Sequence, residues 1–177
     1  YTLHHMQLLP SWRDLIIEQA KVRIIDENIA RIFKCLDMLT TEQIWFRIHQ
    51  HTNPIGNLVL HLEGNARQWI LSTFDDAPDH RVRQQEFDTN EPMPGEVLKS
   101  KLNTLALDLT RCLDRISEQK LLDVYTVQCY RESGISIIVH VIEHFSYHTG
   151  QIAYVTKWLS EKETGFYEGQ PLDQTKD

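Results

Sequence analysis

Three histidines recur at four-residue intervals in residues 135–159, ISIIVHVIEHFSYHTGQIAYVTKWL, namely His140, His144 and His148. The apolar residues around them predict a helix, and residues four apart on a helix share one face with Cβ atoms roughly 5–6 Å apart. Two imidazoles at that spacing can bind one divalent metal ion. Because two ligands leave such an ion too exposed, the segment predicts a metal site whose third ligand comes from elsewhere in the chain.

The elements that must position these histidines follow from apolar periodicity. Four amphipathic segments, separated by loops rich in Pro, Asn and Gly, predict an all-α bundle of helices. We expect long helices at about residues 11–39, 55–71, 94–116 and 135–159, and a brief helix after Thr40. Asn53 and Pro54 are expected to be the N-cap and the first residue of the second long helix.

The connecting segments are harder to assign. Residues 75–95 are polar and contain several prolines, which predicts a long loop. Its charged stretch RVRQQEF either covers one end of the bundle, contacts an anionic ligand or is solvated, and we favour solvation. Residues 117–134 fit an irregular connector or a short extended segment, and the tail from about residue 165 is expected to be loosely ordered.

His61 lies in the middle of the second predicted helix, close to an apolar stripe, with Asn65 one turn later on the same side. A buried polar side chain needs a partner, since leaving it unpaired costs about 1–3 kcal/mol. A lone histidine here is most simply a hydrogen-bonded core residue, but the histidine pair on the fourth helix also makes it a candidate ligand. His49 and His51 lie in a polar break and are interpreted as loop residues.

Composition narrows the class of protein. The 177 residues are 41% apolar, enough for one core, so we expect a single domain over residues 1–177. The net charge of -7 argues against a nucleic-acid or anionic-membrane partner. Three widely spaced cysteines, Cys35, Cys112 and Cys129, without a CxxC motif, are interpreted as buried thiols in a reducing compartment. Without a visible secretory signal or an apolar run of ~20 residues, we expect a soluble, cytoplasmic protein.

Two segments carry a resemblance to a known family. HLEGNARQWI at residues 61–70 and EHFSYHTGQI at residues 143–152 resemble the signature regions of the DinB-like superfamily, and more closely an uncharacterised branch with a His-Leu-x-Gly-Asn motif. The resemblance extends from the first helix to Leu159 and implies a DinB-like four-helix bundle of the up-down-down-up type. It also implies a divalent metal, zinc or nickel, bound by His61, His144 and His148.

The resemblance and the donor set together indicate a class of chemistry. Three neutral imidazoles would leave one or more positions of a metal open, as in catalytic zinc sites, and would favour an anionic fourth ligand such as hydroxide, thiolate or carboxylate. The superfamily includes bacillithiol transferases and a mycothiol-dependent maleylpyruvate isomerase, although Thr149 stands where many thiol-transferring relatives have arginine. We therefore expect a metal-dependent transferase or hydrolase acting on a small molecule, such as a low-molecular-weight thiol. The alternative is a non-catalytic bundle whose histidines are structural or hold a structural metal.

Metal-bound imidazoles need an acceptor for the other ring N–H. Asn65, Glu143 and Gln151 are candidates by their position in the sequence, although Glu143 is offset by about 100° from His144 around the helix. His140, one turn before the pair, is expected to support the site or to line its pocket, and no catalytic base is assigned. A homodimer is also expected, as the resemblance implies and as helix-bundle surfaces commonly allow.

Overall fold

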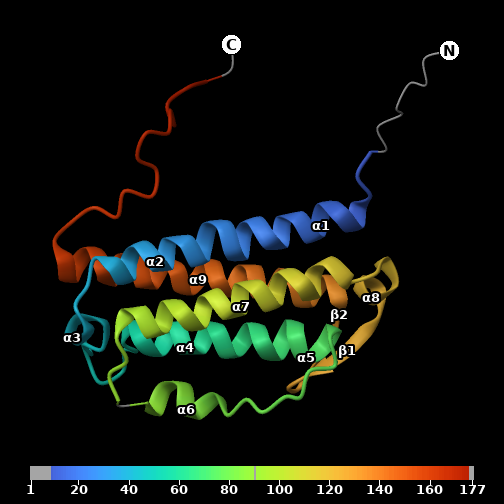
Figure 1. Cartoon of the computed structure of the whole chain (residues 1–177), viewed down its shortest axis with the longest axis horizontal. Helices are drawn as coiled ribbons and strands as arrows, with labels where there is room; N and C mark the ends of the chain where they lie inside the picture. Colours follow the sequence, from blue (N-terminus) through green and yellow to red (C-terminus); the bar gives the residue numbers. More distant parts are fainter. Residues whose placement is uncertain (1–8, 90, 176–177) are drawn as a thin grey trace.

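The structure is a computed structural model that describes residues 9–89 and 91–175, and these residues are mostly helical with one short β-hairpin (Figure 1). The predicted all-α class is therefore confirmed. In chain order the elements are α1 (Trp12–Lys21), η1 (Val22–Ile29), α2 (Ala30–Asp37), α3 (Thr41–Ile44), α4 (Ile55–Ala66), η2 (Arg67–Leu71), α5 (Ser72–Phe74), α6 (Arg83–Asp88), α7 (Gly95–Arg115), α8 (Glu118–Leu122), β1 (Val124–Val127), β2 (Tyr130–Ser133) and α9 (Gly134–Ser160). The stretches η1 and η2 are π-helical and continue the helices beside them.

The first long helix, α1–η1–α2, begins where the sequence predicts. The Ser11 hydroxyl accepts the Asp14 N–H at 3.2 Å while the Asp14 carboxylate accepts the Ser11 N–H at 3.3 Å, so two of the free amides at the helix start are satisfied. The helix ends at Asp37. On α1 the buried residues are Ile17 and Ala20, whereas Leu15 is 54% exposed.

The second long helix, α4–η2–α5, spans residues 55–74 and differs from expectation at its start. The N-cap is Pro54 and not Asn53, and no side chain caps this end. Trp45 secures it instead, because its indole packs on Gly56, where a Cβ would lie 2.6 Å from the ring, and donates to the Met93 carbonyl at 2.9 Å.

Two of the predicted irregular segments contain regular structure. The expected loop at residues 75–95 holds α6, a short helix that packs against α4. Residues 117–134 form α8, whose N-cap Ser117 accepts the Lys120 N–H, followed by the antiparallel hairpin β1–β2 with Val127 opposite Tyr130. The hairpin agrees with the short extended segment that was one of the two alternatives for residues 117–134. The short helices α6 and α8 were not expected, because they lack a long apolar repeat.

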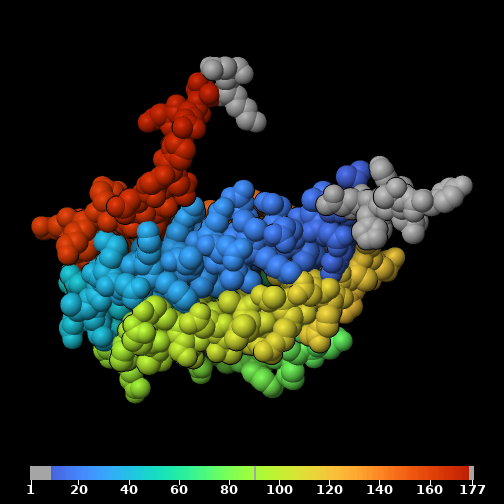
Figure 2. Space-filling model, turned by 45° about the horizontal axis from the view of Figure 1, so that its top comes forward, coloured from blue at the N-terminus to red at the C-terminus, as the bar shows by residue number. Residues whose placement is uncertain are grey.

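The long helices pack around one cluster of buried apolar side chains contributed by all of them. α4 contacts α9 and α7, and α9 also contacts η1 and α2. Figure 2 shows α1–α2 and α7 side by side on one face of the molecule. This packing holds α4 and α9 next to each other, so the histidines of the second and fourth long helices can meet.

Two of the three cysteines are buried. Cys35 and Cys112 are buried, and burial raises the pKa of both thiols, that of Cys112 to about 12. The expectation of a buried thiol is wrong for Cys129, which lies in the hairpin turn and is exposed.

Residues of the tail lie on α2, where Lys34 donates to the Gly165 carbonyl at 2.9 Å. Among the described residues no helix is long and apolar enough to cross a membrane.

Candidate metal centre

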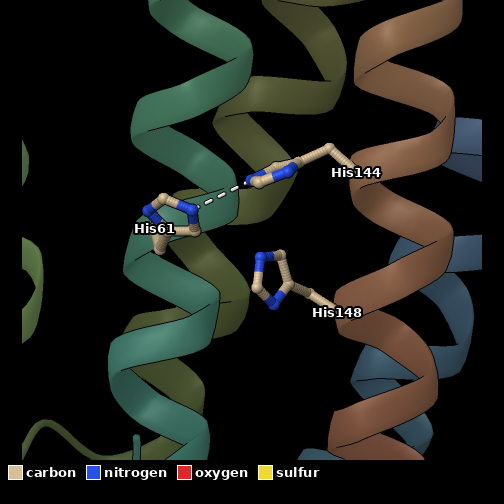
Figure 3. Close-up of side chains that lie close together, drawn as sticks. All are labelled: His61, His144 and His148. Carbon is tan, nitrogen blue, oxygen red and sulfur yellow. Dashed lines mark hydrogen bonds between the residues drawn. The ribbon is translucent and has the colours of Figure 1, made fainter.

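Three histidines converge between α4 and α9 (Figure 3). His61 projects from α4, and His144 and His148 project from successive turns of α9. The Nε2 atoms of His61 and His144 are 2.9 Å apart, and one ring nitrogen from each of the three residues lies within 4.8 Å of the others. His61 is buried and the other two are half-buried, so this group could hold a metal ion at the edge of the core.

Hydrogen bonds on the far sides of two rings decide which nitrogen of each faces the centre. The Nδ1 of His61 lies 2.8 Å from Glu86 Oε2, and since an ionised carboxylate only accepts, Nδ1 carries the proton and donates. The Nδ1 of His148 likewise donates to Gln151 Oε1 at 2.8 Å, and Gln151 is one of the three acceptors expected from the sequence. His61 Nε2 is thereby an acceptor, and it accepts the hydrogen bond from His144 Nε2 at 2.9 Å (Figure 3). The Nε2 lone pairs of His61 and His148 are the ones that a cation could bind.

Glu86 and Arg81 are the part of the centre that the sequence does not predict. Arg81 donates to Glu86 from Nε at 2.7 Å and from a terminal nitrogen at 3.0 Å, and their side chains are only 5% and 11% exposed. The segment is held in place by Asn57, which donates to the Glu86 carbonyl at 2.7 Å, and by Phe87, whose ring centre lies 4.8 Å from that of His61. The favoured interpretation of RVRQQEF as solvated is therefore wrong at Glu86, because His61 and Arg81 draw it into a buried pair.

Gly64 makes this approach sterically possible. A Cβ at this position would overlap Glu86 Oε1 and would lie 3.2 Å from Arg81 Nε. The glycine follows His61 by three residues on the same helix and so lies beneath the carboxylate that holds the imidazole. The glycine of the His-Leu-x-Gly-Asn motif thus has a steric reason to be there.

The surroundings keep the site's groups in the protonation states that metal binding requires. Burial, and then the neighbouring His148 and His61, lower the pKa of His144 to about 3, and burial also lowers the pKa of His148. Burial raises the pKa of Glu86, but the hydrogen bonds from His61 and Arg81 outweigh it, so the pKa lies below its usual value. At neutral pH His144 and His148 are therefore neutral bases and Glu86 is a carboxylate.

The other predicted supporting residues take different places. His140 stacks on Trp69 at 3.9 Å between ring centres and lies 5.5 Å from His144, and its buried Nε2 has no hydrogen-bond partner among the described residues. Asn65 is buried, and within the described part of the chain it makes no hydrogen bond to the three imidazoles. Glu143 is exposed and lines the adjoining cleft.

A cleft of about 560 Å³ opens beside His61 and His144. Its walls come from the segment before and within α6, from the β-hairpin and from the first half of α9, and they include aromatic, basic and acidic side chains. Ligand pockets commonly have volumes of about 300–1,000 Å³, so the cleft is large enough for a small molecule that reaches the imidazoles.

The donor set fits a divalent transition metal. Nitrogens bound at 2.0–2.1 Å would be ~2.9 Å apart at a right angle and ~3.3 Å apart at a tetrahedral angle. The 2.9 Å between His61 and His144 lies at the lower end of this range, so only small ring movements would be needed there. The carboxylate on the far side of His61 matches the partner that metal-bound histidines usually have.

Fold and site thus define a mostly helical protein with three histidines, from two helices, that could hold a metal ion. The model of a family described as "Protein of unknown function (DUF1572)" matches residues 16–166, and the chain belongs to this family. No curated protein matches the chain. The family description assigns no activity, so the function must be argued from the site.

Proposed function

We propose that this protein is a DinB-like, metal-dependent enzyme that binds zinc or nickel through His61, His144 and His148 and catalyses thiol transfer or hydrolysis on a small molecule. The observation that carries the proposal is the meeting of three imidazoles between α4 and α9, two of them held by acceptors on their far side. A purely structural set of core histidines would not need its ring nitrogens turned toward one point.

The arrangement of the helices supports the DinB-like bundle of the up-down-down-up type. In Figure 1, α4 and α7 run from left to right, whereas α1–α2 and α9 run from right to left. The motif residues also lie where that bundle requires them, with His61 on the second long helix and His144 and His148 on the last.

Each group of the chain then has a defined part. Bound here, a divalent cation would act as a Lewis acid and would lower the pKa of a water or thiol, which prepares a nucleophile at neutral pH. Glu86 and Gln151 hold the rings of His61 and His148 in the tautomer and orientation that metal binding needs. The adjoining cleft would admit a substrate to one side of the centre. The buried Arg81–Glu86 pair and the ring of Phe87 pack against His61.

The proposal is tested by metal content and by exchange at the open position. Protein purified without chelator should contain about one transition-metal ion per chain by elemental analysis, and His144→Ala should lose it, whereas the exposed loop variant His51→Ala should not. Cobalt-substituted protein should change its visible spectrum when a thiol such as 2-mercaptoethanol is added. Absence of metal under every purification condition would overturn the proposal, and bound metal that no thiol or small anion perturbs would favour a structural metal that only joins α4 to α9.

A further inference from the structure

The cleft beside the three histidines carries charges of both signs on different elements. Arg81 and Arg83 come from the segment at α6, whereas Glu132 lies on β2 and Glu143 on α9. Arg81 is neutralised by Glu86, to which it donates two hydrogen bonds. For the other three side chains there is no ion pair within the described part of the chain, so the cleft presents one cation and two carboxylates to a ligand.

Arg83 is held close to the metal centre by its contacts. Its guanidinium carbon lies 4.9 Å from the centre of the Phe87 ring, and Phe87 lies 4.8 Å from the ring of His61. A guanidinium over an aromatic face keeps its N–H groups free at the ring edge, where they can bind a carboxylate in two-pronged geometry. The cationic end of the cleft is thus within reach of a ligand that also touches the histidines.

The two carboxylates line the cleft together with His140. Glu143 follows His140 by three residues on α9, so the two lie one turn apart, and β2, which carries Glu132, packs against α9. His140 in turn stacks next to His144. The anionic end of the cleft is therefore also next to the histidine centre, on the side of α9 and the hairpin, and exposed Tyr130 lies in its wall.

From this arrangement we infer that the cleft binds a small zwitterion of the amino-acid type, with its carboxylate at Arg83, its ammonium group at Glu132 and Glu143, and a third donor atom directed at the metal centre. The inference rests on the proposed function, because the third donor requires the metal. A ligand with one charge would leave the opposite charge of the cleft unmatched. The volume of about 560 Å³ accommodates a molecule of this size.

The experiment uses the whole 177-residue chain, loaded with cobalt and titrated with four thiols. L-cysteine carries both charges, 3-mercaptopropionate only the carboxylate, cysteamine only the ammonium, and 2-mercaptoethanol neither. Because cysteine and cysteamine also chelate free cobalt, each ligand is compared between variants and not with the other ligands. The variants are Arg83→Gln and Glu143→Gln, with Glu118→Gln on α8, also exposed and outside the cleft, as the matched control.

We expect a ligand-specific pattern of losses. Arg83→Gln should weaken L-cysteine and 3-mercaptopropionate about three- to tenfold and leave cysteamine within about twofold. Glu143→Gln should weaken L-cysteine and cysteamine by a similar factor and should not weaken 3-mercaptopropionate, and Glu118→Gln should change none of them. If 2-mercaptoethanol perturbs the cobalt spectrum but the variants shift all four thiols alike or not at all, the zwitterion is refuted while the open metal site stands. If cobalt binds and no thiol perturbs it, the proposed function fails and the zwitterion with it.

Discussion

Replacing Glu86 by Gln tests how the candidate metal centre is assembled. The change removes the negative charge that accepts from His61 Nδ1 at 2.8 Å and keeps the size of the side chain. Loss of a group that orients a metal-bound histidine typically costs 10–100-fold in metal affinity, about 1.4–2.7 kcal/mol. We expect a loss in this range, measured by competition with a chromophoric chelator for cobalt or zinc.

The same change should also destabilise the metal-free protein. Arg81 is only 5% exposed and would lose its counter-charge, and removing one partner of a buried ion pair costs about 3–5 kcal/mol. Because Gln keeps one acceptor oxygen, we expect a loss near the lower end of that range in chemical denaturation with chelator present. The double variant Arg81→Met/Glu86→Gln removes the buried cation as well, so it should recover stability but not metal affinity.

Measuring stability and metal affinity separately distinguishes the two roles of Glu86, as the partner of Arg81 and as the acceptor of His61. Glu63→Gln is the matched control, since Glu63 pairs with Arg67 on the same helical segment but lies outside the centre. It should leave metal affinity within about twofold, because Glu63 pairs with Arg67 and not with an imidazole, and loss of this partly exposed pair costs only ~0–1 kcal/mol. If Glu86→Gln destabilised the protein yet bound metal as tightly as the wild type, Glu86 would be only the partner of Arg81, and its role at His61 would be refuted.

Three further outcomes are expected. Gly64→Ala should weaken metal binding about tenfold or more, because the added Cβ displaces Glu86. At Gly150 an added Cβ meets open space, so Gly150→Ala should leave metal binding unchanged and should stabilise the helix by up to about 1 kcal/mol. Equal effects of the two variants in thermal denaturation and in chelator competition would contradict the steric argument. Replacing His140 by Ala should cost less metal affinity than His144→Ala, and the opposite order would exchange their roles. In metal-free protein the pKa of His144 lies near 3, so between about pH 6.5 and 3 the unfolded chain takes up a proton that the fold does not, and stability falls as the pH falls. From pH 7.5 to pH 5 this amounts to about 2 kcal/mol in the limit and about 1 kcal/mol after solvent screening, measured by urea denaturation, and a wild-type loss no larger than that of His144→Gln would contradict it.

Local chemistry made two helix starts predictable, that of the first long helix and that of α3. The Ser11–Asp14 capping box and the Thr40–Gln43 box lie at the observed helix starts, because each satisfies free amides with residues three positions apart. The start of α4 was misjudged, since a tertiary contact of Trp45 with Gly56 secures it where a capping side chain was expected. The short helix α6 was missed because six residues carry too little periodicity to be seen against a polar background.

The residues of the candidate centre also differ in how far the sequence alone predicts them. Spacing alone places His140, His144 and His148 on one helix face, and the resemblance singles out His144 and His148 as the ligand pair. Gln151 follows from its distance of three residues from His148 along the helix. His61 needed the histidine pair and the resemblance as well, since a single histidine on an apolar helix face is most simply an ordinary core residue. Glu86 had one usable signal, a charged stretch within a loop longer than compact domains usually contain without a functional reason.

By itself, the sequence determined the all-α class, the helix that carries the histidine pair and the face on which that pair lies, because these depend on contacts within a few residues. Only the tertiary structure decided that His61 meets the pair across two helices and that Glu86, 25 residues further along the chain, reaches behind it. It also decided that His140 stacks on Trp69 and stays outside the group of three. The physical reason is that a carboxylate in a polar loop has no periodic pattern to mark it, and its burial depends on a counter-charge and on a glycine that makes room for it.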